Sequence, residues 1–134
     1  QEWKHDGLVM DNWFRLQATR HEDTTLENVK ALMQHESFSI QNPNRLRALV
    51  GTFSAANMHR FHAKDGSGYA FLHSVLETLN TSNPQVASRL ITPLLQLKRF
   101  EPVRQQKMRD VLTALAAKND LSRDLYEKIT KALA

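Results

Sequence analysis

Two arginines that follow Asn-Pro pairs are the residues of this chain whose chemistry is easiest to name. The segments QNPNRLRALVGTF (41–53) and SNPQVASRLITPL (82–94) share a polar start, and they place Arg47 and Arg89 a few residues after it. A guanidinium group suits a carboxylate, because its planar fork donates two parallel, charge-assisted hydrogen bonds. The two arginines are therefore candidates for binding an acidic group, and ordinary surface arginines are the alternative that the residues alone leave open.

A polar stripe extends the second of these segments. At about 100° per residue on an α-helix, Gln85, Arg89, Thr92 and Gln96 fall within about 60° of one another. Pro93 is expected to kink or split this helix, because its ring removes a backbone donor. Gln85 and Arg89 precede the proline, so their common face does not depend on it.

Two His-Glu pairs suggest a metallopeptidase motif that the sequence does not complete. The motif H-E-x-x-H places two imidazoles on one helix face, with the glutamate beside a metal-bound water. Here the segments read HEDTT (21–25) and HESFS (35–39), so Thr25 and Ser39 occupy the position of the second ligand. Both segments are interpreted as polar helix boundaries.

A further histidine pair, His59 and His62, could share a helix face, with Asp65 as the nearest third ligand. Two imidazoles without a fixed third ligand bind a metal weakly, so surface or loop histidines are the expected arrangement. The stretch DGSG (65–68) is too short for a phosphate-binding loop and is expected to be a tight loop before a helix.

Basic residues are concentrated in residues 98–109, where only Glu101 opposes them. Aromatic residues do not alternate with them apart from Phe100, and no nucleic-acid-binding motif accompanies them. A solvated helix face is the expected arrangement. The basic residues are Lys98, Arg99, Arg104, Lys107 and Arg109.

The composition favours one helical domain. The chain has 134 residues, of which 41% are hydrophobic and 24% are charged, which is enough for an ordinary core. Glycine and proline number only four each, which favours helices. The absence of cysteine excludes disulfides, iron–sulfur clusters and thiolate zinc sites. The net charge of +4 is a mild bias, and no apolar run approaches the roughly 20 residues needed to cross a bilayer.

Helical spacing of apolar residues predicts an all-α fold, because no segment alternates with a period of two for long enough to be a strand. The first helix is expected over residues 8–19, with Val9, Trp13 and Leu16 on one side as its apolar stripe. Further helix starts are predicted by a capping box at Thr24 and Glu27, by Asn-Pro at 42–43 and 83–84, by Glu101-Pro102 and by Ser122.

Helix starts near residues 43, 84 and 122 recur with a spacing of about 40 residues, and another helix lies between each pair. Helical-hairpin repeats of the HEAT or armadillo kind have periods of about 40–47 residues and stack to bury one continuous core. The sequence therefore predicts a HEAT/armadillo-like superhelical stack of antiparallel helix pairs, with a generic helical bundle as the alternative. Such stacks bind ligands on their concave side, which Arg47 and Arg89 could both face.

In addition to these patterns, the chain resembles the C-terminal end of the bacterial aminopeptidase N family of zinc-dependent alanyl aminopeptidases. The likeness runs in order over essentially all of the chain, and its most specific stretches are DGSGY, NPQVASRL and LYEKITKALA. The other stretches that carry it are WKHDGLVMDNWF (3–14), LENVKALMQHESF (26–38), NPNRLRALVGTF (42–53), FHAKDGSGYAFL (61–72), NPQVASRLITPLLQLKRF (83–100) and RDLYEKITKALA (123–134).

The resemblance implies that residues 1–134 form a single helical domain within a superhelix that closes over the active-site chamber of the enzyme. In the family, zinc and the H-E-x-x-H motif belong to an upstream catalytic domain, and this motif is absent here. The chain is therefore expected to be non-catalytic and to hold no cofactor itself. The implied partners are the catalytic domain of the same polypeptide and peptide substrates, in the cytoplasm, with no nucleic acid and no membrane.

The resemblance also implies three substrate-binding residues and one exposed surface. Arg47 in NPNRLR, and Gln85 and Arg89 in NPQVASR, would meet the carboxylate end of a peptide. The first helix would pack on helices outside this chain, so exposed apolar surface is expected near residues 1–19. Two other functions remain as alternatives: an independent helical-repeat scaffold for a protein partner, and a nucleic-acid binder that uses residues 98–109.

Overall fold

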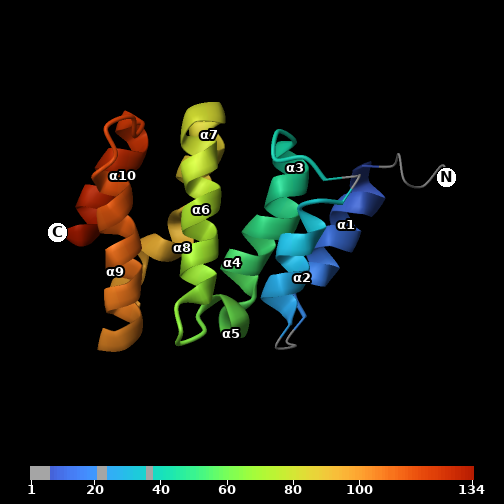
Figure 1. Ribbon diagram of the computed structural model, residues 1–134, viewed down its shortest axis with the longest axis horizontal. Helices are drawn as coiled ribbons and strands as arrows, with labels where there is room; N and C mark the ends of the chain where they lie inside the picture. The colour runs from blue at the N-terminus through green and yellow to red at the C-terminus, as the bar shows by residue number, and fades with distance from the viewer. Residues whose placement is uncertain (1–6, 21–23, 36–37) are drawn as a thin grey trace. The chain divides into compact units, whose positions relative to one another are not determined.

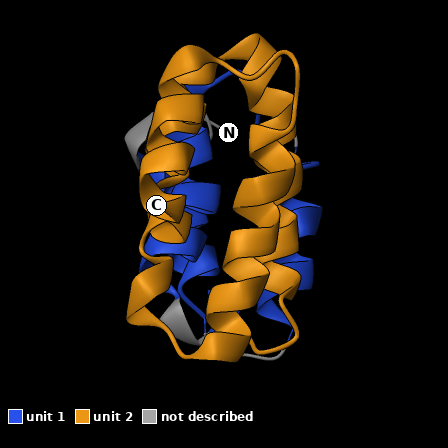
Figure 2. Ribbon diagram, turned by 90° about the vertical axis from the view of Figure 1, so that its left-hand side faces the viewer, with its two compact units in different colours: residues 1–61 blue, residues 62–134 orange. Residues whose placement is uncertain are grey.

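The computed structural model describes residues 7–20, 24–35 and 38–134. Within these ranges every regular element is a helix, which confirms the predicted all-α class (Figure 1). The chain divides into two compact units, unit 1 (Gln1–Phe61) and unit 2 (His62–Ala134), coloured separately in Figure 2. The single domain over residues 1–134 stays a prediction.

Unit 1 is built around α1, which packs against α2 and against the helical run formed by α3, η2 and α4. Its core is aromatic: Phe14, Phe53 and Phe61 are fully buried, and the rings of the last two meet edge to face at 6.1 Å. The elements are α1 (Gly7–Ala18), α2 (Thr25–Leu32), α3 (Pro43–Leu46), the π-helical η2 (Arg47–Gly51), α4 (Thr52–Ala56) and α5 (Met58–Phe61).

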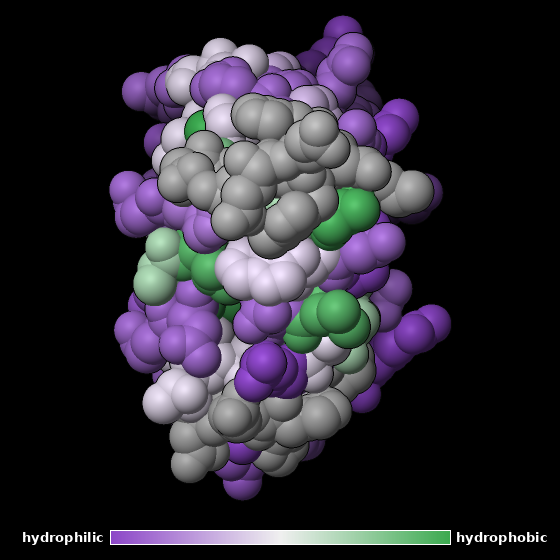
Figure 3. Space-filling model, turned by 90° about the vertical axis from the view of Figure 1, so that its right-hand side faces the viewer, coloured by the Kyte–Doolittle hydropathy of each residue, from purple (hydrophilic) through white to green (hydrophobic). Residues whose placement is uncertain are grey.

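The apolar stripe predicted for α1 is not the buried face of this helix. Met10, Phe14 and Ala18 are buried, whereas Val9 and Leu16 are 41% and 65% exposed. Apolar residues lie on both sides of α1, so their spacing alone does not say which side faces the core. Figure 3 shows separate hydrophobic patches among hydrophilic side chains on the side of the molecule where α1 lies. The exposed apolar surface expected near residues 1–19 is confirmed at Val9 and Leu16.

Unit 2 is built around α6, which packs against α7 and α9, while α10 contacts α7, α8 and α9. The predicted tight loop precedes α6: Gly66 has a φ of 79°, and Asp65 Oδ1 accepts hydrogen bonds from the backbone N–H and the hydroxyl of Ser67. The elements are α6 (Ser67–Ser82), α7 (Pro84–Leu90), α8 (Thr92–Leu95), the 3-10 helix η3 (Leu97–Arg99), α9 (Pro102–Ala116) and α10 (Arg123–Leu133).

Most predicted helix starts are confirmed by their capping hydrogen bonds. These bonds form within a few residues, so the local sequence is enough to predict them. The capping box at Thr24 is wrong: its side chain makes no capping bond, and the hydroxyl of buried Thr25 donates instead to the carbonyl of Arg20 at 2.9 Å. The side chains that do accept a first-turn N–H are those of Asn42, Asn83, Glu101 and Ser122.

Candidate functional site

Gln85 and Arg89 lie one turn apart on the exposed side of α7. Asn83 caps the helix and Pro84 occupies its first turn, so the local sequence fixes where α7 begins. The opposite side of α7 is buried, which leaves these two side chains toward solvent. Within the part of the chain that the structure describes, neither side chain takes part in a hydrogen bond or an ion pair.

The polar stripe predicted beyond Arg89 is interrupted. α7 ends at Leu90 and α8 begins at Thr92, so Pro93 splits the helix as expected. Thr92 and Gln96 are exposed, but they lie beyond the break. The continuous part of the stripe is therefore the single turn that carries Gln85 and Arg89.

Arg47 is exposed, and its neighbour Arg45 has a different role. An Arg47 guanidinium nitrogen donates to Asn44 Oδ1 at 2.6 Å, a bond within its own turn. Arg45 Nε donates to Asp11 Oδ1 at 2.9 Å, and its side chain is only 13% exposed. Arg45 thus links α3 to α1, which leaves Arg47 as the arginine of this segment that presents its guanidinium to solvent.

Both candidate arginines lie where helical hydrogen bonding departs from the α pattern. Arg47 is the first residue of the π-helical η2, a feature that the sequence did not predict. Arg89 is in the last turn of α7, just before the break. Short π segments inside helices occur frequently at functional sites, which makes this position of Arg47 informative. An exposed guanidinium at either position suits a carboxylate ligand.

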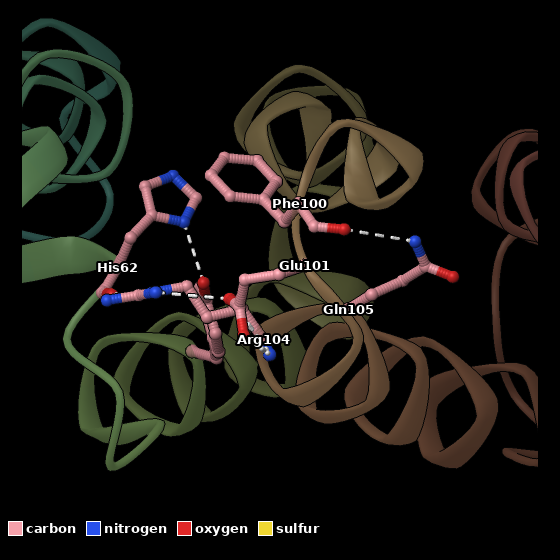
Figure 4. Close-up of polar contacts among 6 residues, drawn as sticks. His62, Phe100, Glu101, Arg104 and Gln105 are labelled. Atoms are coloured by element: carbon pink, nitrogen blue, oxygen red, sulfur yellow. Dashed lines mark hydrogen bonds and ion pairs between the residues drawn. The ribbon is translucent and has the colours of Figure 1, made fainter.

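A buried polar cluster in unit 2 was missed by the sequence analysis (Figure 4). His62 lies in the turn after α5, as a loop histidine would, but it is only 6% exposed and is therefore not on the surface. Its Nδ1 lies 2.7 Å from the Tyr69 hydroxyl, its ring stacks on Phe100 at 4.2 Å, and its carbonyl accepts from Arg104 Nε at 2.6 Å. Arg104 also pairs with Glu101 at 3.1 Å.

Burial determines the protonation of this cluster. It lowers the pKa of His62 from the ordinary 6.5 to about 4, helped by the nearby Arg104 guanidinium. Burial also raises the pKa of Tyr69 to about 12. Both groups are neutral at physiological pH, and their ring contacts indicate a packing role. The side chain of His59, the other half of the predicted pair, lies outside the described residues, as do His21, Glu22 and Glu36.

The basic residues of segment 98–109 largely bind acceptors of their own unit. Lys98 Nζ donates to the carbonyl of Ala134 at 2.9 Å, and Arg109 donates to the carbonyl of Leu133 at 3.3 Å. Both carbonyls belong to the C-terminal end of α10, where cations are favourable. Arg104 binds the His62 carbonyl, so this segment is not a uniform solvated face.

Among the residues that the structure describes, no three His, Cys, Asp or Glu side chains come together as a metal site. The donor set of this part of the chain therefore does not fit a zinc ion. No helix in the described ranges is long and apolar enough to cross a membrane.

Comparisons with known proteins identify the family. A family described as "Domain of unknown function (DUF3458_C) ARM repeats" matches residues 1–134. The chain belongs to this family. The ARM-repeat class predicted from the sequence is thereby confirmed, and the resemblance to the C-terminal part of bacterial aminopeptidase N is confirmed by the relatives described next.

The ARM-repeat domain is similar to two curated proteins named aminopeptidase N. It is 57% identical over 133 residues to that of Escherichia coli and 56% identical over 133 residues to that of Haemophilus influenzae. A crystal structure of Legionella pneumophila aminopeptidase A in complex with aspartic acid is also similar, with a TM-score of 0.91 and 32% identity over 98% of this chain. Each match covers about 99% or 98% of this chain but only 15% of the other protein. The ARM-repeat domain thus corresponds to a C-terminal helical part of these relatives and spans about 15% of their length.

Proposed function

We propose that this domain is a non-catalytic helical part of a zinc aminopeptidase, and that it closes the active-site chamber in which N-terminal residues are released from peptides. Two observations support the proposal: the similarity to aminopeptidases N and the absence of H-E-x-x-H from this chain. Zinc and the catalytic motif are supplied by the remainder of the polypeptide. The cytoplasmic location, and the absence of nucleic-acid and membrane partners, stay predictions.

In this proposal Arg47, Gln85 and Arg89 line the chamber and bind the carboxylate end of the peptide. The observation that carries this role is the exposed turn of α7, where Gln85 and Arg89 stand together without intramolecular partners in the described structure. An arginine that is not already paired binds a carboxylate without first breaking another contact.

The role of Arg89 is tested in the intact aminopeptidase with two substrates of different length. We expect Arg89→Ala to raise the KM for a tetrapeptide about tenfold, the size of one lost charge-assisted contact. The KM for an aminoacyl amide, which has no distant carboxylate, stays the same.

The matched control is Arg123→Ala on α10, because its side chain is 91% exposed and pairs with Glu127 within the same helix. This variant leaves both KM values unchanged. An equal effect of Arg89→Ala on the two substrates contradicts the role.

An independent scaffold that binds another protein is the second candidate, favoured by the exposed Val9 and Leu16 on α1. Under the first proposal this face contacts the preceding part of the same polypeptide. A defined complex between the isolated chain and a separate protein, formed without the catalytic domain, would favour the scaffold. Sedimentation of the chain with and without that protein distinguishes the two.

A further inference from the structure

We propose that Ser88, Asp124 and Lys128 form a clamp that fixes the rotation of α7 and thereby aims Gln85 and Arg89. This inference rests on the function proposed above, because it assigns positioning residues to the same site. All five residues belong to unit 2.

The clamp holds one residue at two points. Ser88 is only 3% exposed, and its hydroxyl donates to Asp124 Oδ2. Lys128 Nζ donates to the backbone carbonyl of Ser88 at 3.0 Å. Asp124 and Lys128 lie one turn apart on α10, and their charged groups are 3.8 Å apart. The hydroxyl and the carbonyl of Ser88 are thus bound by adjacent turns of a single helix.

The backbone of α7 explains why this carbonyl needs an outside donor. The last four carbonyls of a helix have no intrahelical partner, and Ser88 belongs to the last turn of α7. An ammonium group at this end also interacts favourably with the helix dipole. Lys128 therefore stabilises the turn in which Arg89 lies.

α7 depends on such contacts for its orientation. It has seven residues, too few to be stable as an isolated helix, so packing must hold it in place. Its other buried side chains are apolar, and apolar contact is not directional. The hydrogen bonds at Ser88 are directional, so they restrict rotation of α7 about its own axis.

The helical geometry relates this restriction to the candidate site. At about 100° per residue, Ser88 is about 60° from Gln85 and about 100° from Arg89 around the helix. The clamp therefore lies on the flank of the exposed turn and does not obstruct a ligand there. Loss of the clamp broadens the range of directions of the Arg89 guanidinium, which weakens a contact that needs a fixed geometry.

The test uses Lys128→Met in the intact aminopeptidase, since methionine keeps much of the apolar stem and removes the donor. We expect the KM for a tetrapeptide to rise roughly threefold to fivefold with kcat unchanged, because a misaimed arginine loses part of its charge-assisted contact. The KM for an aminoacyl amide does not change. Lys128→Arg retains a donor, so its KM for the tetrapeptide stays close to that of the unsubstituted enzyme. Ser88→Ala, which removes the other half of the clamp, shifts the tetrapeptide KM in the same direction.

The matched control is Lys118→Met, because Lys118 is likewise partly exposed and pairs with Glu77 and Asp120, neither of which belongs to α7. It leaves the KM for both substrates unchanged. Thermal unfolding of every variant separates a change in stability from a change in the orientation of Arg89. A change in stability alone does not alter the ratio of the two KM values.

The triple variant Gln85→Ala/Arg89→Ala/Lys128→Met distinguishes the clamp from the function on which it rests. If the clamp acts through Gln85 and Arg89, adding Lys128→Met to the Gln85→Ala/Arg89→Ala variant changes nothing further. If Arg89→Ala alone affects both substrates equally, the proposed function fails. The clamp is refuted, and the proposed function stands, if Arg89→Ala is selective for the tetrapeptide but Lys128→Met behaves otherwise. This is so if Lys128→Met leaves the tetrapeptide KM unchanged, raises the KM of both substrates equally, or adds to the effect of removing the side chains that the clamp orients.

Discussion

The two units differ in the kind of polar side chain that they bury. In the described part of unit 1 the buried polar residues are Thr25, Ser54 and Asn57, none of which titrates. Asn57, for example, donates to the carbonyls of Ala18 and Arg20. Unit 2 buries His62, whose neutral form is stabilised by its surroundings. Acid should therefore weaken unit 2 selectively, although both units consist of similar helices.

The two Asn-Pro starts, one in each unit, differ in a second respect. Both begin a helix with an asparagine cap. In unit 1 the helix continues through a π-helical turn, and Arg47 is bound to Asn44 of its own turn. In unit 2 the helix stops, and the described structure gives Arg89 no partner. The same kind of helix start is therefore followed by one arginine that is hydrogen-bonded within the chain, Arg47, and by one with no partner in the described structure, Arg89.

The pH dependence of the free energy of unfolding should show the largest difference between the two units. The pKa of His62 is about 4 in the folded chain and 6.5 ordinarily, so the unfolded chain takes up the proton first. The free energy of unfolding that depends on His62 is intact above pH 6.5 and falls as the pH drops toward 4, by about 3 kcal/mol in total. Hydrogen exchange, analysed as the free energy of opening, should show this loss in unit 2.

The control for this prediction is His62→Gln, which cannot titrate and whose amide can hydrogen-bond to the Tyr69 hydroxyl as donor or acceptor. In this variant the loss between pH 6.5 and 4 should largely disappear from unit 2. If the variant keeps the full pH dependence, or if unit 1 loses as much protection as unit 2, the comparison is wrong.

What the sequence predicted well depends on contacts within a few residues. Asn42, Asn83 and Ser122 bond to N–H groups of the turn that they begin, so their chemistry is visible locally. The neighbourhood of Gln85 and Arg89 follows from one helical turn in the same way.

What the sequence missed depends on distant parts of the chain. Arg45 differs from Arg47 because Asp11, on another helix, pairs with it. His62 is buried because Phe100 and Tyr69 pack on it. The buried face of α1 and the π-helical turn at Arg47 likewise depend on packing. No local pattern contains these contacts.

Removal of the helix caps should lower the free energy of unfolding by less than the acid effect at His62. It also compares the two Asn-Pro helix starts directly. The Asn42 side chain accepts from two N–H groups, at 3.0 and 3.3 Å, whereas that of Asn83 accepts from one, at 3.4 Å. We expect Asn42→Ala to lower the free energy of unfolding by about 1–2 kcal/mol and Asn83→Ala by about 0.5–1 kcal/mol. Urea unfolding measures both, and the reverse order would show that the number of N–H bonds that the cap accepts does not determine its contribution to stability.

The smallest expected effect is on the KM for a tetrapeptide, and it concerns Arg47, which is already hydrogen-bonded to Asn44. Under the proposed function, a peptide carboxylate that binds Arg47 replaces the bond to Asn44, so the net gain is the difference between two contacts. Arg47→Ala should therefore raise the tetrapeptide KM only about twofold to threefold, less than Arg89→Ala. Asn44→Ala removes the competing acceptor, so it should lower that KM slightly, and only while Arg47 is present. If Asn44→Ala has the same effect in the Arg47→Ala background, the intramolecular bond does not compete with substrate. If Arg47→Ala exceeds Arg89→Ala, prior engagement does not decide which of the two arginines contributes more to binding.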